Sequence, residues 1–291
     1  MPHPMTSLAV TAFAASVLDS TAVLAANTNS HDHVDDHVIQ EQRENLAKTT
    51  KDAGFGPQSP RDLSQHAGEN TRAFSTAPAY TAMNLCDIHF HENAEHKGGE
   101  FTTYAGNGNG KGFGTGFKYD GTLTDAELTP VGHPVGDSEY GDLQSGDTIE
   151  IHFVHSTAQA QPGPTLGTCL SDAIANPQLR VETVVAVLVN DPKAADFTQM
   201  AAVSKVDGLY QAENIPNNLG TPVLYEGSTT GPSYNEKGSP FQVTWSVRPQ
   251  VIKVDINSVD AWFKDNVFHE DHAHGVRNLV ENVHLLSPID Q

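Results

Sequence analysis

The sequence predicts a mainly β protein, a single domain with a few short helices. The chain has 291 residues, which is enough for one large domain with a full core. Its 24 glycines and 17 prolines are typical of short strands joined by turns. IEIHFVH at 149–155 and VETVVAVLVND at 181–191 are rich in the β-branched residues that strands favour. The charged fraction of only 18% excludes a coiled coil or a disordered chain.

The first 26 residues resemble an export signal. An apolar run, LAVTAFAASVL, is followed by TAVLAA, which has small residues where a signal peptidase would cut. The run is too short to span a membrane. The signal is imperfect, because no Lys or Arg precedes the run and Asp19 interrupts it. We therefore expect a signal peptide at 1–26 and a periplasmic or secreted protein.

A polar segment follows at 27–53, with HDHVDDH at 31–37. Its histidines could scavenge metal, as His-rich tracts can. A solvated, mobile linker without fixed geometry fits the composition better. The turn-rich stretch GFGPQSPRDL then opens the domain, which we expect to cover 54–291.

Two histidine-bearing strands predict a metal site. His89 and His91 are two residues apart, so on a strand they point to one face. In the second strand, IEIHFVH, His152 is the inward candidate and His155 has the opposite parity. Two histidines from one strand and one from its neighbour give a tetrahedral Zn²⁺ an open fourth position, as in catalytic sites. The alternative is that these are polar residues on a half-buried sheet, but the second histidine strand favours metal.

The remaining elements are less specific. The glycine-dense stretch 104–121 lacks the GK[ST] ending of a phosphate loop, so it predicts a surface loop or an irregular hairpin. The run at 181–191 predicts a buried central strand. The spacing of Phe197, Met200 and Ala201 predicts a helix within 193–211, and 241–263 predicts two strands and a short helix.

The charge and the cysteines limit the partners and the compartment. A net charge of −20 repels nucleic acid and anionic membranes, so we expect neither a nucleic-acid partner nor stable membrane insertion. The chain has two cysteines, Cys86 and Cys169, and in a secreted protein these most simply form a disulfide. Two separate buried thiols are the alternative.

The histidine motifs resemble those of a known family. HFH at 89–91, the Glu95-His96 pair and E-I-H-F-V-H at 150–155 are similar to the alpha-class carbonic anhydrases, and the chain resembles the delta class and its bacterial relatives more closely. The resemblance runs from about 58 to 288. It implies a large, mostly antiparallel sheet and a zinc ion held by His89, His91 and His152.

The same resemblance implies roles for further residues. GSTTGP at 227–232 is similar to the family's GSLTTPP loop, with one residue fewer. It implies that Thr229 donates to Glu95 and orients a zinc-bound hydroxide, with Thr230 beside the substrate.

The resemblance also implies roles behind the metal ligands. His96 would be structural. Glu150 and Glu92 are both candidates to hold a ligand histidine. The family's proton-shuttle insert is mostly missing, so no shuttle residue is assigned.

The implied activity is the reversible hydration of carbon dioxide to bicarbonate and a proton. The substrate would be a small molecule, and the sequence does not indicate an oligomeric state. The rival is a periplasmic zinc-binding or zinc-delivery protein without catalysis, which HDHVDDH and HEDHAH at 269–274 would suit. The presence of Glu95 and Thr229 argues against this rival, because storage needs no pair that orients a hydroxide.

Overall fold

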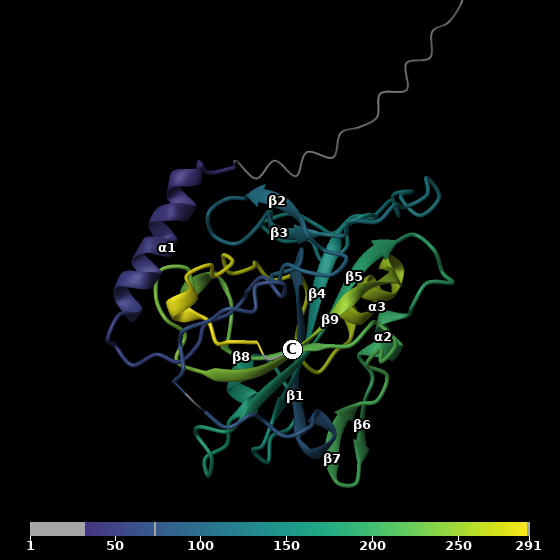
Figure 1. Ribbon diagram of the computed structural model, residues 1–291. Coiled ribbons are helices and arrows are strands. Elements are labelled where there is room, and N and C mark those ends of the chain that lie inside the picture. Colours follow the sequence, from purple (N-terminus) through teal and green to yellow (C-terminus); the bar gives the residue numbers. More distant parts are fainter. Residues whose placement is uncertain (1–32, 73, 290–291) are drawn as a thin grey trace, which may run out of the picture.

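A five-stranded sheet runs through the centre of the molecule in the computed structural model, which describes residues 33–72 and 74–289 (Figure 1). Three of its four pairings are antiparallel, and the pairing of β5 with β9 is parallel. This confirms the predicted mainly β class and mostly antiparallel sheet. In sheet order, the strands are β1 (Asn84–Glu92), β4 (Thr148–Ser156), β5 (Leu179–Val189), β9 (Gln242–Asp255) and β8 (Val223–Ser228).

Two small hairpins and several short helices surround this sheet. No helix in the described part of the chain is long and apolar enough to cross a membrane. The hairpins are β2 (Thr103–Asn107) with β3 (Thr115–Lys118), and β6 (Val203–Val206) with β7 (Leu209–Ala212). The α-helices are α1 (Asp36–Thr50), α2 (Phe197–Met200) and α3 (Ile256–Lys264), and the 3₁₀ turns are η1 (Tyr80–Ala82), η2 (Leu166–Cys169), η3 (Pro232–Tyr234) and η4 (Val283–Leu285).

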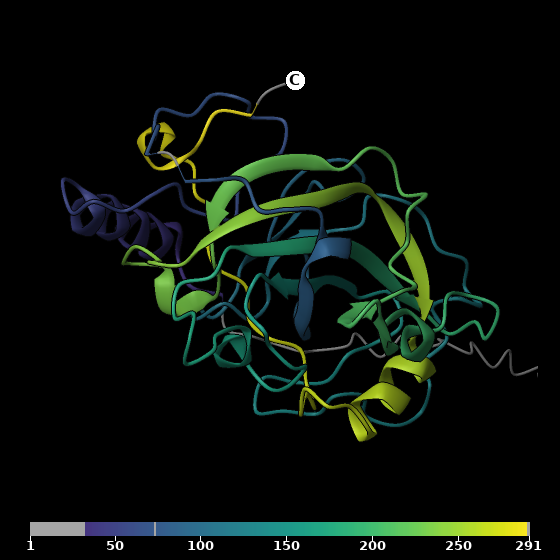
Figure 2. The same ribbon diagram turned by 90° about the horizontal axis from the view of Figure 1, so that it is seen from below.

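The core lies on both faces of the sheet around β5. Every residue of β5 except Arg180 is buried, as expected for a central strand. Val184 and Leu188 join an apolar cluster with α2 and α3, while Val181 joins a second cluster with Trp245 on the opposite face. Figure 2 shows α3 packed along one side of the sheet. The second cluster does not fill its face of the sheet, because Val181 and Trp245 also line a cavity there.

The helix predicted within 193–211 is much shorter than expected. Only Phe197–Met200 is α-helical, and β6 and β7 follow as a hairpin. Asp207 and Gly208 both have positive φ, at 50° and 88°, which is the backbone of a tight hairpin turn. Val203 and Val206 are β-branched and favour a strand. The helical spacing therefore ends where strand and turn signals take over.

The segment predicted as a mobile linker contains an ordered helix. In α1, the side chains of Ile39 and Leu46 are buried, and Leu46 packs against Val280 and Leu286 near the C-terminus. Figures 1 and 2 both show α1 beside this C-terminal segment. The sequence prediction was wrong here because few apolar residues mark the helix, and their partners lie more than 200 residues away in the chain. The expected export signal at 1–26 lies outside the described residues.

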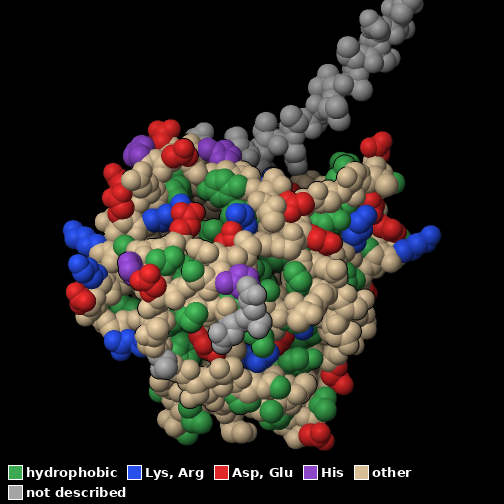
Figure 3. All heavy atoms as spheres, in the orientation of Figure 1, with side chains coloured by type: hydrophobic (Ala, Val, Ile, Leu, Met, Phe, Trp, Pro, Cys, Tyr) green, Lys and Arg blue, Asp and Glu red, His purple; other side chains and the backbone are tan. Residues whose placement is uncertain are grey.

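The predicted disulfide between Cys86 and Cys169 is present. The two Cα atoms are 5.1 Å apart, and the bond ties β1 to η2. Both cysteines are fully buried. On the face shown in Figure 3, the Lys and Arg side chains are scattered and form no continuous basic patch.

His155 makes the stability of the fold depend on pH. It is fully buried, and its Nδ1 donates to the carbonyl of Phe153 at 2.9 Å, while Nε2 has no partner among the described residues. Burial lowers the pKa of His155 from 6.5 to about 4. Because the unfolded state takes up this proton first, stability is lost as the pH falls below 6.5, and the loss is complete near pH 4.

We expect this group alone to cost about 2 kcal/mol of unfolding free energy at pH 5 relative to pH 7. Urea denaturation of metal-free protein at the two pH values measures the loss, and His155→Phe should reduce it by that amount. His284→Gln is the control, because the His284 side chain is 72% exposed. An equal pH dependence in His155→Phe and wild type would contradict this assignment.

Candidate metal centre

The strand register brings three histidines together. β1 and β4 are antiparallel neighbours, with His89 directly opposite His152 and His91 opposite Glu150. His89 and His91 share one face of β1. One ring nitrogen from each of the three histidines lies within 4.8 Å of the others. The structure thus places together all three residues that the sequence predicted as zinc ligands.

Each of these histidines has its other ring nitrogen engaged by a fixed oxygen. An acceptor at one nitrogen holds the proton there and leaves the second nitrogen with a lone pair. The three pairs are His89 Nδ1 with Asp87 Oδ2 (2.7 Å), His91 Nδ1 with the Gly275 carbonyl (3.0 Å) and His152 Nε2 with Glu150 Oε1 (2.8 Å).

The three remaining nitrogens suit a metal ion. His91 Nε2 is buried and has no hydrogen-bond partner among the described residues. His89 Nε2 and His152 Nδ1 face each other at 3.3 Å. With the protons held on the outer nitrogens, these are two opposed lone pairs, which a shared cation would stabilise. Three neutral imidazoles are a donor set that zinc prefers, so the residues present fit zinc.

Burial favours the neutral form of two of the three histidines. Burial lowers the pKa of His152 to about 4 and lowers the pKa of His91 well below its usual value. Burial would also lower the pKa of His89, but the charge of Asp87 and its hydrogen bond raise it above its usual value. Metal binding needs the neutral form of each imidazole, so we expect it to be weaker at low pH.

Glu150 connects the site to a buried polar network. Besides His152, Glu150 Oε1 contacts His96 Nδ1 at 2.7 Å, and Glu150 Oε2 accepts from the His96 backbone N–H at 3.0 Å. His96 Nε2 lies 2.6 Å from the Tyr225 hydroxyl. Burial raises the pKa of Glu150, but His96 and His152 together lower it well below its usual value. Both nitrogens of His96 are engaged, which suits the structural role expected for it.

The structure does not show the expected contact between Thr229 and Glu95, and Thr230 is the threonine that influences Glu95 instead. The Thr229 hydroxyl bonds Ser239 Oγ at 2.5 Å. Burial raises the pKa of Glu95 above its usual value, and the Thr230 hydroxyl is one of the groups that partly offset this effect. Glu95 Oε2 has no hydrogen-bond partner among the described residues. Glu95 Oε1 accepts from the Arg277 backbone N–H at 2.9 Å. The loop is one residue shorter than the family's. Aligning the two loops from their proline ends assigned the orienting role to Thr229, which is one position before the threonine that influences Glu95.

A cavity of about 520 Å³ opens over the three histidines. One part of its lining is apolar, and Thr229 and Thr230 lie on another part. The HEDHAH segment at 269–274 also contributes to the lining. The apolar members include Val154, Leu166, Leu179, Val181, Val243 and Trp245, and the members from HEDHAH are Glu270, His272 and His274.

The sequence reasoning missed several of these residues. Asp87 could have been found, because it lies two positions before His89 and therefore has the same strand parity. The Gly275 carbonyl has no sequence signal, since any residue has a backbone oxygen. Of the two candidate carboxylates, Glu150 holds a ligand histidine, whereas Glu92 lines a separate hollow near Tyr140.

A family comparison agrees with this geometry. The model of the delta carbonic anhydrase family matches residues 80–258, which is more than half of the chain and includes all three histidines. The chain belongs to the delta carbonic anhydrase family. It is therefore a carbonic anhydrase, an enzyme that hydrates carbon dioxide. No curated protein matches the chain.

Solved structures of alpha-carbonic anhydrases are also similar to this carbonic anhydrase over most of its length. The enzyme from Thermovibrio ammonificans, in complex with sulfanilamide, is 16% identical over 80% of this chain and 87% of its own, with a TM-score of 0.27. The enzyme from Photobacterium profundum is 17% identical over 84% and 95%, also with a TM-score of 0.27. TM-scores this low add nothing to the family match.

We expect one zinc ion per chain, and substitution of any one of the three histidines with alanine should remove most of it, because two imidazoles hold zinc far more weakly than three. Elemental analysis of the purified variants measures this. His272→Ala is the matched control, since His272 lines the same cavity without belonging to the three. Full zinc content in His89→Ala would place the metal elsewhere.

Proposed function

We propose that the chain hydrates carbon dioxide at a zinc ion held by His89, His91 and His152. The observation that carries the proposal is that the three histidines each bring one ring nitrogen, the one that no oxygen engages, to a cavity with an apolar wall. Bound zinc lowers the pKa of a water ligand to about 7 and so supplies a nucleophile at neutral pH. Asp87, Glu150 and the Gly275 carbonyl would hold the three rings in the orientation that zinc needs.

The apolar wall would hold the substrate. Carbon dioxide carries no net charge and no hydrogen-bond donor, so it binds best against hydrocarbon. Val181 and Leu179 of β5 and Val154 of β4 provide this surface, and Trp245 closes it next to His152, with ring centroids 5.0 Å apart. These side chains also keep competing water away from the carbon that is attacked.

Thr230 is the residue that we assign to orient the nucleophile. Burial raises the pKa of Glu95 above its usual value, while the charge of His152, the Arg277 N–H and the Thr230 hydroxyl each favour the ionised form. When it is ionised, the Glu95 carboxylate only accepts hydrogen bonds, so the Thr230 hydroxyl would donate to it. The lone pairs of Thr230 then face the cavity and can accept the proton of the reacting water.

The rival function, zinc storage or delivery, explains less of the site. It accounts for the three histidines and for HEDHAH, but it gives no role to the pairing of Thr230 with Glu95 or to the apolar wall. The disulfide supports a periplasmic or secreted location, since such bonds persist in oxidising compartments. We also propose that residues 54–291 form the catalytic domain, against which α1 packs.

Thr230→Ala should lower kcat/KM for carbon dioxide hydration by about 10²-fold, because the nucleophile loses the acceptor that aims it. Thr229→Ala is the matched control and should change kcat/KM by much less, since its hydroxyl bonds Ser239. Stopped-flow assays with parallel zinc analysis measure both variants. Normal activity in Thr230→Ala, or an equal loss in both variants at full zinc content, would contradict the assignment.

Glu95→Gln should show the same loss as Thr230→Ala, because a neutral amide can donate to the threonine and reverse its orientation. The double variant should lose little more than either single variant, since residues that act as one unit are not additive. A double variant whose loss equals the product of the two single losses would show that Glu95 and Thr230 act separately.

A further inference from the structure

We propose that Asp87 determines specificity by placing a fixed negative charge in the wall of the cavity, which disfavours anions and so favours neutral carbon dioxide. This inference rests on the proposed function and adds a selection among ligands of the same site. Anions in this sense include the product bicarbonate and small inorganic anions that would compete for the open position of the metal.

Asp87 is held in the cavity wall by the local shape of β1. The register with β4 shifts between Leu85 and Asp87, so Cys86 lies in an irregularity of the strand. Asp87 is only 2% exposed and lines the cavity. Its Oδ2 accepts from His89 Nδ1, while its Oδ1 is buried and has no partner among the described residues. An unpaired buried carboxylate oxygen is rare and calls for an explanation.

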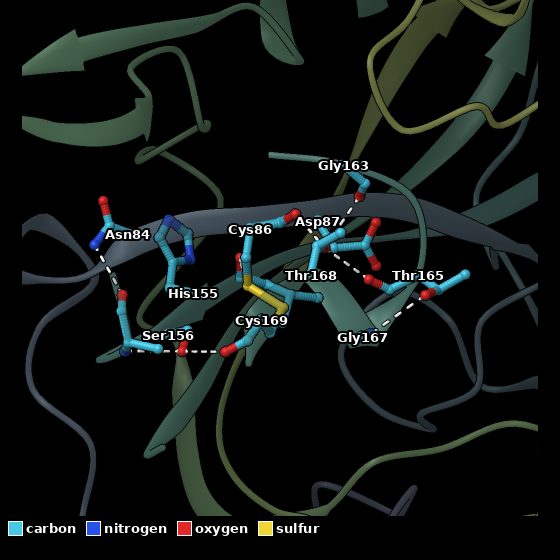
Figure 4. Close-up of a disulfide and its surroundings, with 12 residues drawn as sticks. Asn84, Cys86, Asp87, His155, Ser156, Gly163, Thr165, Gly167, Thr168 and Cys169 are labelled. Carbon is cyan, nitrogen blue, oxygen red and sulfur yellow. Dashed lines mark hydrogen bonds between the residues drawn. A yellow bond between two sulfur atoms is a disulfide. The ribbon is translucent and has the colours of Figure 1, made fainter. Parts of the chain in front are cut away.

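The disulfide keeps this carboxylate in place. Figure 4 shows Asp87 next to Cys86, with the turn from Thr165 to Cys169 folded over them. The Thr168 hydroxyl and the Gly163 N–H both donate to the Cys86 carbonyl, at 3.0 and 3.1 Å. Because Thr165 and Leu166 of this turn line the same cavity, the disulfide fixes the wall and the charge together.

Among the described residues that line the cavity, none is Lys or Arg. Within the same described lining, the only other carboxylate is that of Glu270, and its Oε2 already pairs with His274 Nε2 at 2.7 Å. An anion that approaches the metal therefore meets the negative charge of Asp87 without a compensating Lys or Arg in the described lining.

The charge itself is not needed to orient His89. A neutral amide oxygen can also accept from His89 Nδ1, so the negative charge is an additional property of the site. In a buried, water-poor wall, a full charge acts strongly on another ion and weakly on a neutral molecule. Asp87 should therefore weaken the binding of anions far more than the binding of carbon dioxide.

The test is anion binding to the cobalt-substituted protein, followed by its visible spectrum rather than by activity. Asp87→Asn keeps the shape and the acceptor but removes the charge. We expect the dissociation constant for thiocyanate to fall about tenfold in this variant, which corresponds to ~1.4 kcal/mol. Binding of imidazole, a neutral metal ligand, should change by less than about twofold, since the removed charge acts mainly on ions.

Asp271→Asn is the matched control, because its carboxylate is 81% exposed near the cavity and solvent screens it. It should leave the thiocyanate affinity unchanged. Asp87→Ser provides a second neutral acceptor if Asp87→Asn does not fold, and it should tighten thiocyanate binding in the same direction. If an Asp87 variant gives a normal cobalt spectrum and an unchanged thiocyanate affinity, this inference is wrong but the proposed metal site stands. A wild-type protein that gives no tetrahedral cobalt spectrum overturns the proposed metal site, and the inference with it.

Discussion

The hydrogen bond on the outer nitrogen of each site histidine is the constraint on which the rest of the site depends. Strand register alone brings His89, His91 and His152 close together, but it does not decide which nitrogen of each ring is free. Asp87, the Gly275 carbonyl and Glu150 make that decision, because each holds a proton on the nitrogen it contacts. Three lone pairs are then left close to one another, an arrangement that a bound cation would stabilise.

The outer contacts explain why the surrounding chain is arranged as it is. Glu150 can serve His152 only if its own charge is stabilised, and His96 provides this from behind the site. The Gly275 carbonyl reaches His91 because the segment after HEDHAH runs beside the end of β1, where His274 N–H donates to the Phe90 carbonyl at 2.9 Å. Asp87 is placed by an irregular strand that a disulfide fixes. The site thus joins distant parts of the chain.

Features that depend on strand periodicity were predictable from the sequence. The two-residue spacing of His89 and His91 requires a shared face, and the aliphatic run at 181–191 requires a buried strand. The helix α1 and the β6–β7 hairpin were not predicted correctly, because their stability depends on tertiary contacts and on turn geometry that local pattern does not report.

The roles of Thr229 and Thr230 could not be separated, since a loop that is one residue shorter can be matched from either end. Only the contact with Glu95 distinguishes them.

The most direct test of the account is the coordination of zinc in the metal-loaded protein, measured by X-ray absorption at the zinc edge. The account predicts four light ligands at about 2.0 Å, of which three are imidazoles and one is an oxygen from solvent. The outer-shell scattering of three imidazole rings should be resolved. A carboxylate in place of an imidazole, or a shell with fewer than three imidazoles, would contradict the claim that these three histidines form the metal site.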